Sequence, residues 1–169
     1  YHVVLASTGS GGAGVTVDGF SITVGNANDA SFSTIIVNGN TIGRYFGGGI
    51  YTVNGTNTLS NNTLSGNSAD NNGGGILTYH GTNTLSNNTF SGNSAGSYGG
   101  GIYTYNGTNT LTNNTLSGNS VLVSGGGIYI FGGTNTLSNN TLSGNSAYFG
   151  GGIYTLGGTN TLTNNTLSG

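Results

Sequence analysis

The chain has 169 residues, a formal net charge of −2, and charged side chains at only 2% of its positions. A single Lys or Arg cannot make the basic surface that nucleic-acid binding needs, the lack of cysteine excludes disulfides and thiolate metal sites, and no apolar run is long enough for a transmembrane helix. Glycine is abundant at 36 residues, but without proline or a strict period of three it does not indicate collagen.

Residues 1–46 contain short apolar runs at 3–5, 15–17, 20–24 and 34–37, which Gly and Asn separate. This pattern is typical of strands joined by turns. The segment also holds Asp18, Asp29 and Arg44, which are most of the charged residues. We predict one or two irregular coils that lead into the repeats described next, and not a separate domain.

From residue 47 onward the sequence repeats itself. The string GGGI begins at residues 47, 73, 99, 125 and 150, so the repeat is 26 residues long three times and 25 residues once. The deletion falls within 146–150 and marks that segment as a loop or turn. Abundant threonine, few strong helix formers and short alternating apolar stretches predict strands.

Three short strands per coil of about 26 residues, with coils one strand spacing of about 4.8 Å apart, predict an all-β, right-handed parallel β-helix of about six coils. It would be one domain over 1–169, with irregular N-terminal coils at 1–46 and five GGGI repeats at 47–169, the last incomplete. Equivalent residues of successive coils would then stack. Internal columns are therefore expected to run upward from Ile50, from Leu59 and from Leu64.

Asparagine recurs at equivalent positions in these repeats. Two structural ladders are predicted, one of Asn61, Asn87, Asn113, Asn139 and Asn164, and one of Asn67, Asn93, Asn119 and Asn145. Asn tolerates the left-handed backbone of a tight bend, and its amide can bond to the coils above and below. The first column also reads as Asn-Asn-Thr glycosylation sequons, but an inward amide could not carry a sugar. The sequons at Asn54 and Asn106 lie at a bend and are sterically open.

The GGGI string, paired with L/F-Ser-Gly-Asn-Ser at 64–68, 90–94, 116–120 and 142–146, resembles the polymorphic outer-membrane-protein repeat with its GGA/GI and FxxN motifs. The opening residues 1–4 and 17–23 are similar to the start of bacterial right-handed β-helix surface proteins of the pectin-lyase-like type. The resemblance covers almost the whole chain and is specific for fold. It implies an exported bacterial adhesin, an autotransporter passenger or a surface-layer or filament protein.

Catalytic chemistry finds little support in the sequence. Glycoside hydrolysis uses two carboxylates about 5–9.5 Å apart. Asp18 and Asp29 could approach each other across one coil, whereas Asp70 stands alone in a loop, and solvated turn residues are the simpler interpretation. His80 fills a bend position that Asn or Gly takes in other coils. No nucleophile has a matching base, so we predict no enzyme activity, no metal and no cofactor.

Two outward columns of large residues follow if Ile50 and Thr52 point inward. We predict an interface that includes Tyr51, Tyr79, Tyr103, Tyr105, Tyr129, Phe131 and Tyr154. Alternatively, part of this stripe lies under a neighbouring loop, or the register is shifted by one residue. Rows of Thr on the next face, such as Thr56 and Thr58, resemble the flat face of ice-binding β-solenoids.

These features favour a structural extracellular protein of the bacterial cell surface, either a filament-forming subunit or an adhesin stalk. Because the last repeat stops midway and the stacked columns are neutral, self-association is expected head to tail, laterally, or both. A polysaccharide or another cell-surface protein is a further possible partner. The alternative is an ice-binding or carbohydrate-binding solenoid that uses the Thr or Tyr face, and a polysaccharide lyase or hydrolase fits less well.

Overall fold

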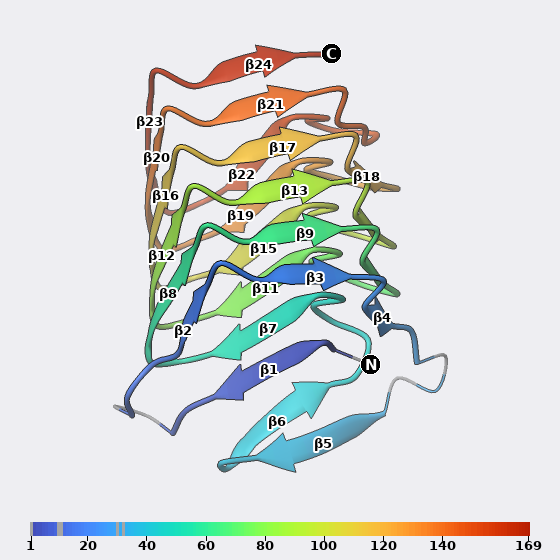
Figure 1. Cartoon of the computed structure of the whole chain (residues 1–169), viewed down its shortest axis with the longest axis vertical. Coiled ribbons are helices and arrows are strands. Elements are labelled where there is room, and N and C mark those ends of the chain that lie inside the picture. Colours follow the sequence, from blue (N-terminus) through green and yellow to red (C-terminus); the bar gives the residue numbers. More distant parts are fainter. Residues whose placement is uncertain (1, 10–11, 30, 32) are drawn as a thin grey trace.

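The protein is an all-β parallel solenoid in the computed structural model, which describes residues 2–9, 12–29, 31 and 33–169 (Figure 1). Three six-stranded sheets run along its axis, and each coil contributes one strand to each sheet. This arrangement confirms the predicted fold class. The described residues include no helix long and apolar enough to cross a membrane.

The strands of each sheet follow one another in the order of the coils. Sheet 1 consists of β1 (Val4–Ser7), β7 (Ile50–Val53), β11 (Ile76–Tyr79), β15 (Ile102–Tyr105), β19 (Ile128–Phe131) and β22 (Ile153–Leu156). Sheet 2 consists of β2 (Thr16–Asp18), β8 (Thr56–Ser60), β12 (Thr82–Ser86), β16 (Thr108–Thr112), β20 (Thr134–Ser138) and β23 (Thr159–Thr163). Sheet 3 consists of β3 (Ser21–Thr23), β9 (Thr63–Ser65), β13 (Thr89–Ser91), β17 (Thr115–Ser117), β21 (Thr141–Ser143) and β24 (Thr166–Ser168). A short sheet 4 consists of β4 (Asn26–Ala27), β10 (Ser68–Ala69), β14 (Ser94–Ala95) and β18 (Ser120–Val121).

Like residues stack on like, as the repeat predicts. Ile76 pairs with Ile50 below and Ile102 above, and Leu85 and Phe90 pair in the same way with the residues of their columns. These side chains are fully buried and form one core between the three sheets. Each contributes about 1.5–3 kcal/mol of transfer free energy before chain entropy is counted.

The corners of each coil need a left-handed backbone. At the corner from sheet 1 to sheet 2, φ lies between 55° and 73° at Asn54, His80, Asn106, Gly132 and Gly157. His80 is thus a turn residue, as predicted. At the corner from sheet 2 to sheet 3, φ lies between 53° and 56° at Asn61, Asn87, Asn113, Asn139 and Asn164. Asn tolerates this conformation better than most residues.

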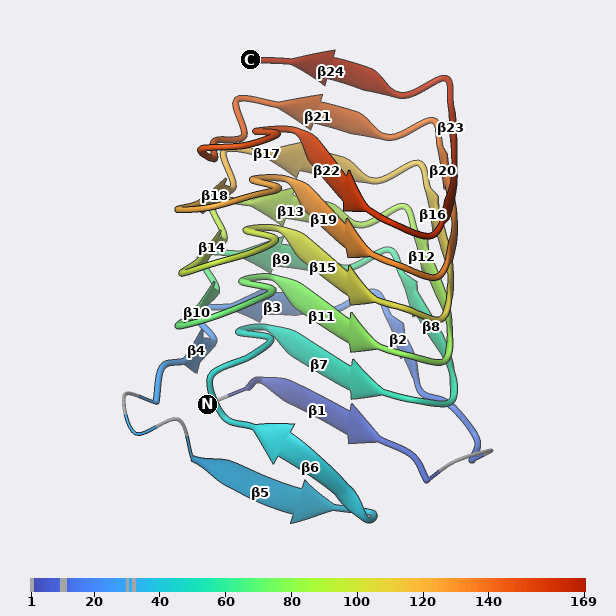
Figure 2. The same cartoon turned by 180° about the vertical axis from the view of Figure 1, so that it is seen from behind.

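The N-terminal segment differs in one respect from the predicted irregular coils. Strands β1 to β4 form one coil that stacks on the repeats, but residues 34–43 leave the solenoid as an antiparallel hairpin of β5 (Thr34–Val37) and β6 (Asn40–Gly43). The turn residues Asn38 and Gly39 both have positive φ, as an Asn-Gly hairpin turn requires. The hairpin lies beside β1 at the N-terminal end of the solenoid (Figure 2).

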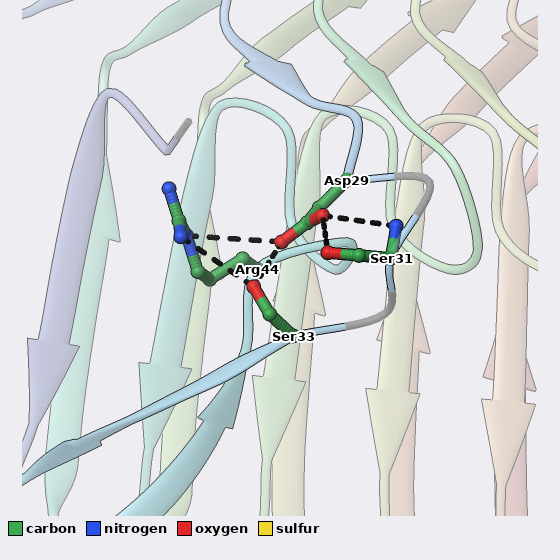
Figure 3. Close-up of polar contacts among 4 residues, drawn as sticks. All are labelled: Asp29, Ser31, Ser33 and Arg44. Carbon is green, nitrogen blue, oxygen red and sulfur yellow. Dashed lines mark hydrogen bonds and ion pairs between the residues drawn. The ribbon is translucent and has the colours of Figure 1, made fainter.

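Polar contacts hold both ends of this hairpin. At the turn, the Asn40 amide donates to Ser7 Oγ and to the Thr8 carbonyl. At the base, Asp29 accepts hydrogen bonds from the Ser31 amide and from the hydroxyls of Ser31 and Ser33, and its Oδ2 lies 3.9 Å from Arg44 Nε (Figure 3). The hydrogen bonds from Ser31 and Ser33 lower the pKa of the Asp29 carboxyl to about 2.

Three threonines are the exception inside the apolar core. The hydroxyls of Thr52, Thr78 and Thr104 are buried and have no hydrogen-bond partner among the described residues. In the next coil the equivalent residue is Ile130, which is also fully buried. A buried hydroxyl without a partner costs about 1–3 kcal/mol. Each of these threonines therefore lowers the stability of the folded chain relative to an apolar side chain of the same shape.

Replacing Thr78 with valine should therefore raise the free energy of unfolding by about 1–2 kcal/mol, since the shape is kept and the unpaired hydroxyl is removed. Chemical denaturation of the purified variant measures the change. The matched control is Thr84→Val on the outer face of sheet 2, which should leave stability within about 0.5 kcal/mol. A destabilised Thr78→Val variant would contradict this explanation.

Candidate functional site

Sheet 1 presents two outward columns, and the inner one is covered by the chain itself. Tyr51, Leu77, Tyr103 and Tyr129 point away from the core, yet each side chain is at most 6% exposed. They form a second cluster with residues of the hairpin and of the corner loops. The prediction that Tyr51, Tyr103 and Tyr129 form an exposed interface is therefore wrong, and the alternative of a stripe under a neighbouring loop is correct for this column.

The cover comes from the corner that returns from sheet 4 to sheet 1. The first glycine of each GGGI string folds onto the inner column, so that a Cβ built on Gly99 would lie 2.8 Å from the Cβ of Tyr103. Rings complete the cover, because Tyr98 lies over Tyr129 with 4.7 Å between ring centroids and Phe46 meets Tyr51 edge-on at 6.2 Å. Pointing away from the core is thus not the same as facing water.

The outer column is the more exposed of the two. It runs through Val53, Tyr79, Tyr105, Phe131 and Leu156. The rings of Tyr79, Tyr105 and Phe131 stack almost parallel, with centroid spacings of 4.8 and 5.1 Å. Tyr79 is 37% exposed, while Tyr105 and Phe131 are half-buried. Tyr154 belongs to the inner column, where it stacks on Tyr129 at 5.3 Å and is half-buried.

The buried tyrosines give the protein a dependence on alkaline pH. Burial raises the pKa of Tyr51 and of Tyr103, and it raises that of Tyr129 too. The unfolded chain releases these protons from about pH 10, whereas the folded chain keeps them. The unfolded state then binds fewer protons than the native state, so stability falls as pH rises.

We expect the free energy of unfolding to decrease by about 1.4 kcal/mol per pH unit above pH 10 for each of Tyr51 and Tyr103, whose pKa burial raises most. Denaturation curves between pH 8 and about pH 11.5 measure the slope. Tyr103→Phe, which removes one ionisable group and keeps the ring, should reduce the slope by one tyrosine's share. An unchanged slope in this variant would mean that Tyr103 ionises equally easily in both states.

Two cavities adjoin the outer column beside the hairpin. One of about 360 Å³ is lined by Thr34, Asn40, Thr41, Gly43, Tyr45, Phe46, Tyr51, Val53 and Tyr79. The other, of about 280 Å³, is lined by Phe46, Asn72, Leu77, Tyr103 and Tyr105, and by Tyr51 and Tyr79 again. The hairpin and the turn after it therefore build one wall of the larger cavity, Phe46 of that turn contributes to the smaller one, and the aromatic face of sheet 1 lines both.

Asparagine ladders run along the axis in three columns. The predicted column of Asn67, Asn93 and Asn119 is buried, and each amide donates to the Oδ1 of the Asn above and to a backbone carbonyl of the coil below. Asn145 accepts from Asn119 at the upper end of this column. A second ladder consists of Asn62, Asn88, Asn114, Asn140 and Asn165, and a third of Asn57, Asn83, Asn109, Asn135 and Asn160.

The other predicted ladder is wrong by one residue. Asn61, Asn87, Asn113, Asn139 and Asn164 are exposed. Their left-handed backbone turns the corner, so that the side chain of the following Asn points inward in their place. The reason given against glycosylation of these sequons, an inward amide, therefore does not hold. The bond that Asn61 does make is to Asp18, whose Oδ1 accepts from it at 2.8 Å.

The acidic residues occupy separate surroundings. Hydrogen bonds from Ser60 and Asn61 lower the pKa of Asp18. Asp29 belongs to the hairpin base, and Asp70 is exposed on a corner loop. Among the described residues, Asp18 and Asp29 share no hydrogen-bond partner.

A small exposed apolar patch was not predicted. On the corner loops of two adjacent coils, Leu122, Val123, Tyr148 and Phe149 are between 37% and 79% exposed. The loops are neighbours, since the Phe149 amide donates to the Val123 carbonyl. The signal was available in the sequence, because the same loop in an earlier coil reads Asp70-Asn71 where this one reads Leu122-Val123. We call these four residues the corner patch.

Comparison with known proteins gives one match. Residues 6–167 match the family described as "Right handed beta helix region". A search of curated proteins and a search of solved structures gave no match.

Proposed function

Since the chain belongs to the right-handed β-helix family, we propose that it is a structural repeat protein of the bacterial cell surface that serves as a stiff stalk or filament subunit outside the cell. The extracellular bacterial setting rests on the resemblance of its GGGI and L/F-Ser-Gly-Asn-Ser motifs. The mechanical role rests on the way successive coils are joined.

The observation that carries the proposal is the set of three asparagine ladders. Each coil from the one that contains β8 to the one that contains β20 is tied to the following coil by backbone ladders on three sides and by the side-chain amides of the asparagine columns. Bending or stretching the solenoid would lengthen many hydrogen bonds at once, in places where water does not replace them. Hydrogen bonding of this kind between successive coils favours a stiff rod that transmits force.

Side-by-side association of rods would use the corner patch. Exposed apolar clusters on a surface that is almost free of charge favour contact with another molecule, and a second copy brings the same patch to the contact. Head-to-tail stacking, in which one solenoid continues another, is the axial form of the same proposal.

Electron microscopy of the purified protein at high concentration tests this proposal. We expect rods that form bundles or filaments, and monodisperse single particles would overturn it. Leu122→Asp with Val123→Asn, which copies the residues found at these positions in an earlier coil, should disperse bundles without lowering the melting temperature. The paired control is Asp70→Asn, on the equivalent loop and outside the patch, which should leave bundling unchanged.

A second candidate function has its own observation. The outward positions of sheet 2 carry regular Thr columns, in which Thr84, Thr110 and Thr136 occupy successive rungs. A flat, uncharged lattice of hydroxyl and methyl groups would suit the surface of an ice crystal. Thermal hysteresis of the wild-type protein measures this, and Thr110→Tyr should abolish any activity by breaking the flat face. A wild type that shapes no ice crystal excludes the second candidate.

A further inference from the structure

A cleft lies where the hairpin meets the outer column. The stacking of the coils does not require it. The cleft comprises the two adjoining cavities, which share Phe46, Tyr51 and Tyr79. In the larger cavity one wall belongs to the repeats and the other to the β5–β6 hairpin, which occurs only once in the described chain, and in the smaller cavity Phe46, just after the hairpin, faces the repeats. The larger cavity, of about 360 Å³, is at the lower end of the range for small-molecule sites, and the adjoining cavity adds about 280 Å³.

The ring stack ends at this cleft. Tyr79 stacks on Tyr105 on one side, but on the other side the equivalent residue of the preceding coil is Val53. Val53 and Tyr79 both line the larger cavity, so the space begins where another aromatic ring would continue the column. His80 contacts Tyr79 edge-on at 4.5 Å, so its ring abuts that of Tyr79 without stacking on it. Tyr79 is 37% exposed and lines both cavities, so its ring borders the cleft.

The polar groups around the cleft are neutral. The exposed hydroxyl-bearing residues Thr34 and Thr41 line the larger cavity, and Asn72 lines the smaller one. The Oδ1 atom of Asn72 is buried and has no hydrogen-bond partner among the described residues. None of the residues that line the two cavities is charged.

We propose that this cleft binds a neutral sugar ring of a glycan. A pyranose has an apolar face of C–H groups that packs against an aromatic face, and a rim of hydroxyls that both donate and accept hydrogen bonds. The exposed ring of Tyr79 provides the platform, and the hydroxyls of Thr34 and Thr41 pair with the hydroxyls of the sugar. An acidic sugar would lose the hydration of its carboxylate without gaining a cation in the lining. No bond is made or broken, so this is a binding site.

The test uses the full chain with trisaccharides of glucose, of mannose and of N-acetylglucosamine as probes, and trigalacturonate as the acidic comparison. Saturation-transfer NMR and calorimetric titration should show that at least one neutral probe binds and that trigalacturonate does not. Tyr79→Val, which places the residue of the preceding coil at this position, should weaken binding at least tenfold. Phe131→Leu, two rungs along the same column and outside both cavities, should leave binding within twofold.

Equal melting temperatures of Tyr79→Val, Phe131→Leu and the wild type would show that both variants are folded. Thr41→Val is a further variant, which removes one hydroxyl and no ring. The proposal is overturned if no neutral probe binds, if trigalacturonate binds as tightly as the best neutral probe, or if the Tyr79 and Phe131 variants lose affinity equally. Bundling in the electron microscope does not depend on these residues, so the two proposals fail separately.

Discussion

Replacing Asn114 with leucine is expected to lower the free energy of unfolding by at least about 3 kcal/mol. Asn114 lies in the middle of the second ladder, where its amide donates to the Leu85 carbonyl and to Asn140 Oδ1. Its own Oδ1 accepts from the backbone amide and from the side-chain amide of Asn88. Leucine fills a similar volume, but it leaves the buried backbone amide of Asn88 without its acceptor, which costs about 1–3 kcal/mol. It also removes one hydrogen bond each from the Asn88 side chain, the Leu85 carbonyl and Asn140 Oδ1, although Asn140 Oδ1 keeps the bond from the backbone amide of residue 114.

Its neighbour provides a matched control. Asn113 is exposed and has a φ of 56°, so Asn113→Gly keeps the backbone conformation available and removes no ladder bond. Urea denaturation should show a change within about 0.5 kcal/mol for this variant. Equal losses at positions 113 and 114 would mean that the buried amides do not hold the coils together.

Replacing Gly100 with alanine should have an effect of similar size for a steric reason. A Cβ at this position would lie 2.5 Å from the Ser120 carbonyl oxygen and 2.6 Å from that of Gly126. Both contacts are with backbone atoms, of strand β18 and of the equivalent corner of the next coil, so the coils would have to separate locally. Overpacking of a close-packed site typically costs about 1–3 kcal/mol and occasionally more, and two contacts with rigid backbone place this variant at the upper end. Thermal denaturation of the purified variant would measure the loss.

The control for Gly100 separates space from backbone conformation. Gly118 has a φ of 61°, and a Cβ built on it meets nothing within 4 Å. Gly118→Ala should therefore cost only the penalty of the left-handed region, about 1–2 kcal/mol. If Gly100→Ala were the milder of the two variants, close packing of the coils at the GGGI corner would not be what requires glycine.

The columns of the core were predictable because the repeat imposes them. Once the residues 26 apart are aligned, Ile50 must stack on Ile76 in any solenoid with one coil per repeat, and alternation along a strand then sets the inward positions. The same alternation would have found the third asparagine ladder, since Asn57 stands two residues before the inward Leu59 in the same strand.

Alternation fails at the corners, and the errors lie there. Asn61 adopts a left-handed conformation, so counting by two from Leu59 assigns the inward amide to the wrong neighbour, and Asn62 is the buried residue. The same limit applies to the aromatic face. Period two places Tyr103 outward, but only the path of the corner loop decides whether water reaches it, and that path depends on the Gly99 bend and on long-range ring contacts.

The hairpin could be foreseen only in part. Strands at 34–37 and a turn at the following Asn and Gly are visible locally, but pairing within the hairpin and pairing with the neighbouring coil use the same backbone groups. The outcome depends on distant partners such as Ser7 and Thr8, which bind Asn40. The cleft beside Tyr79 depends on the position of the hairpin, so it could not be predicted from a local sequence pattern.

The stacking of coils one strand apart is the central claim, and distances between spin labels test it most directly. The chain has no cysteine, so single cysteines can be placed at Thr16 and at one of Thr110, Thr136 or Thr161, which share one column of sheet 2. Double electron–electron resonance should report backbone separations of about 14, 19 and 24 Å from residue 16 to residues 110, 136 and 161, so that each added coil adds the same step. Distances that do not rise by one strand spacing per coil would contradict the account.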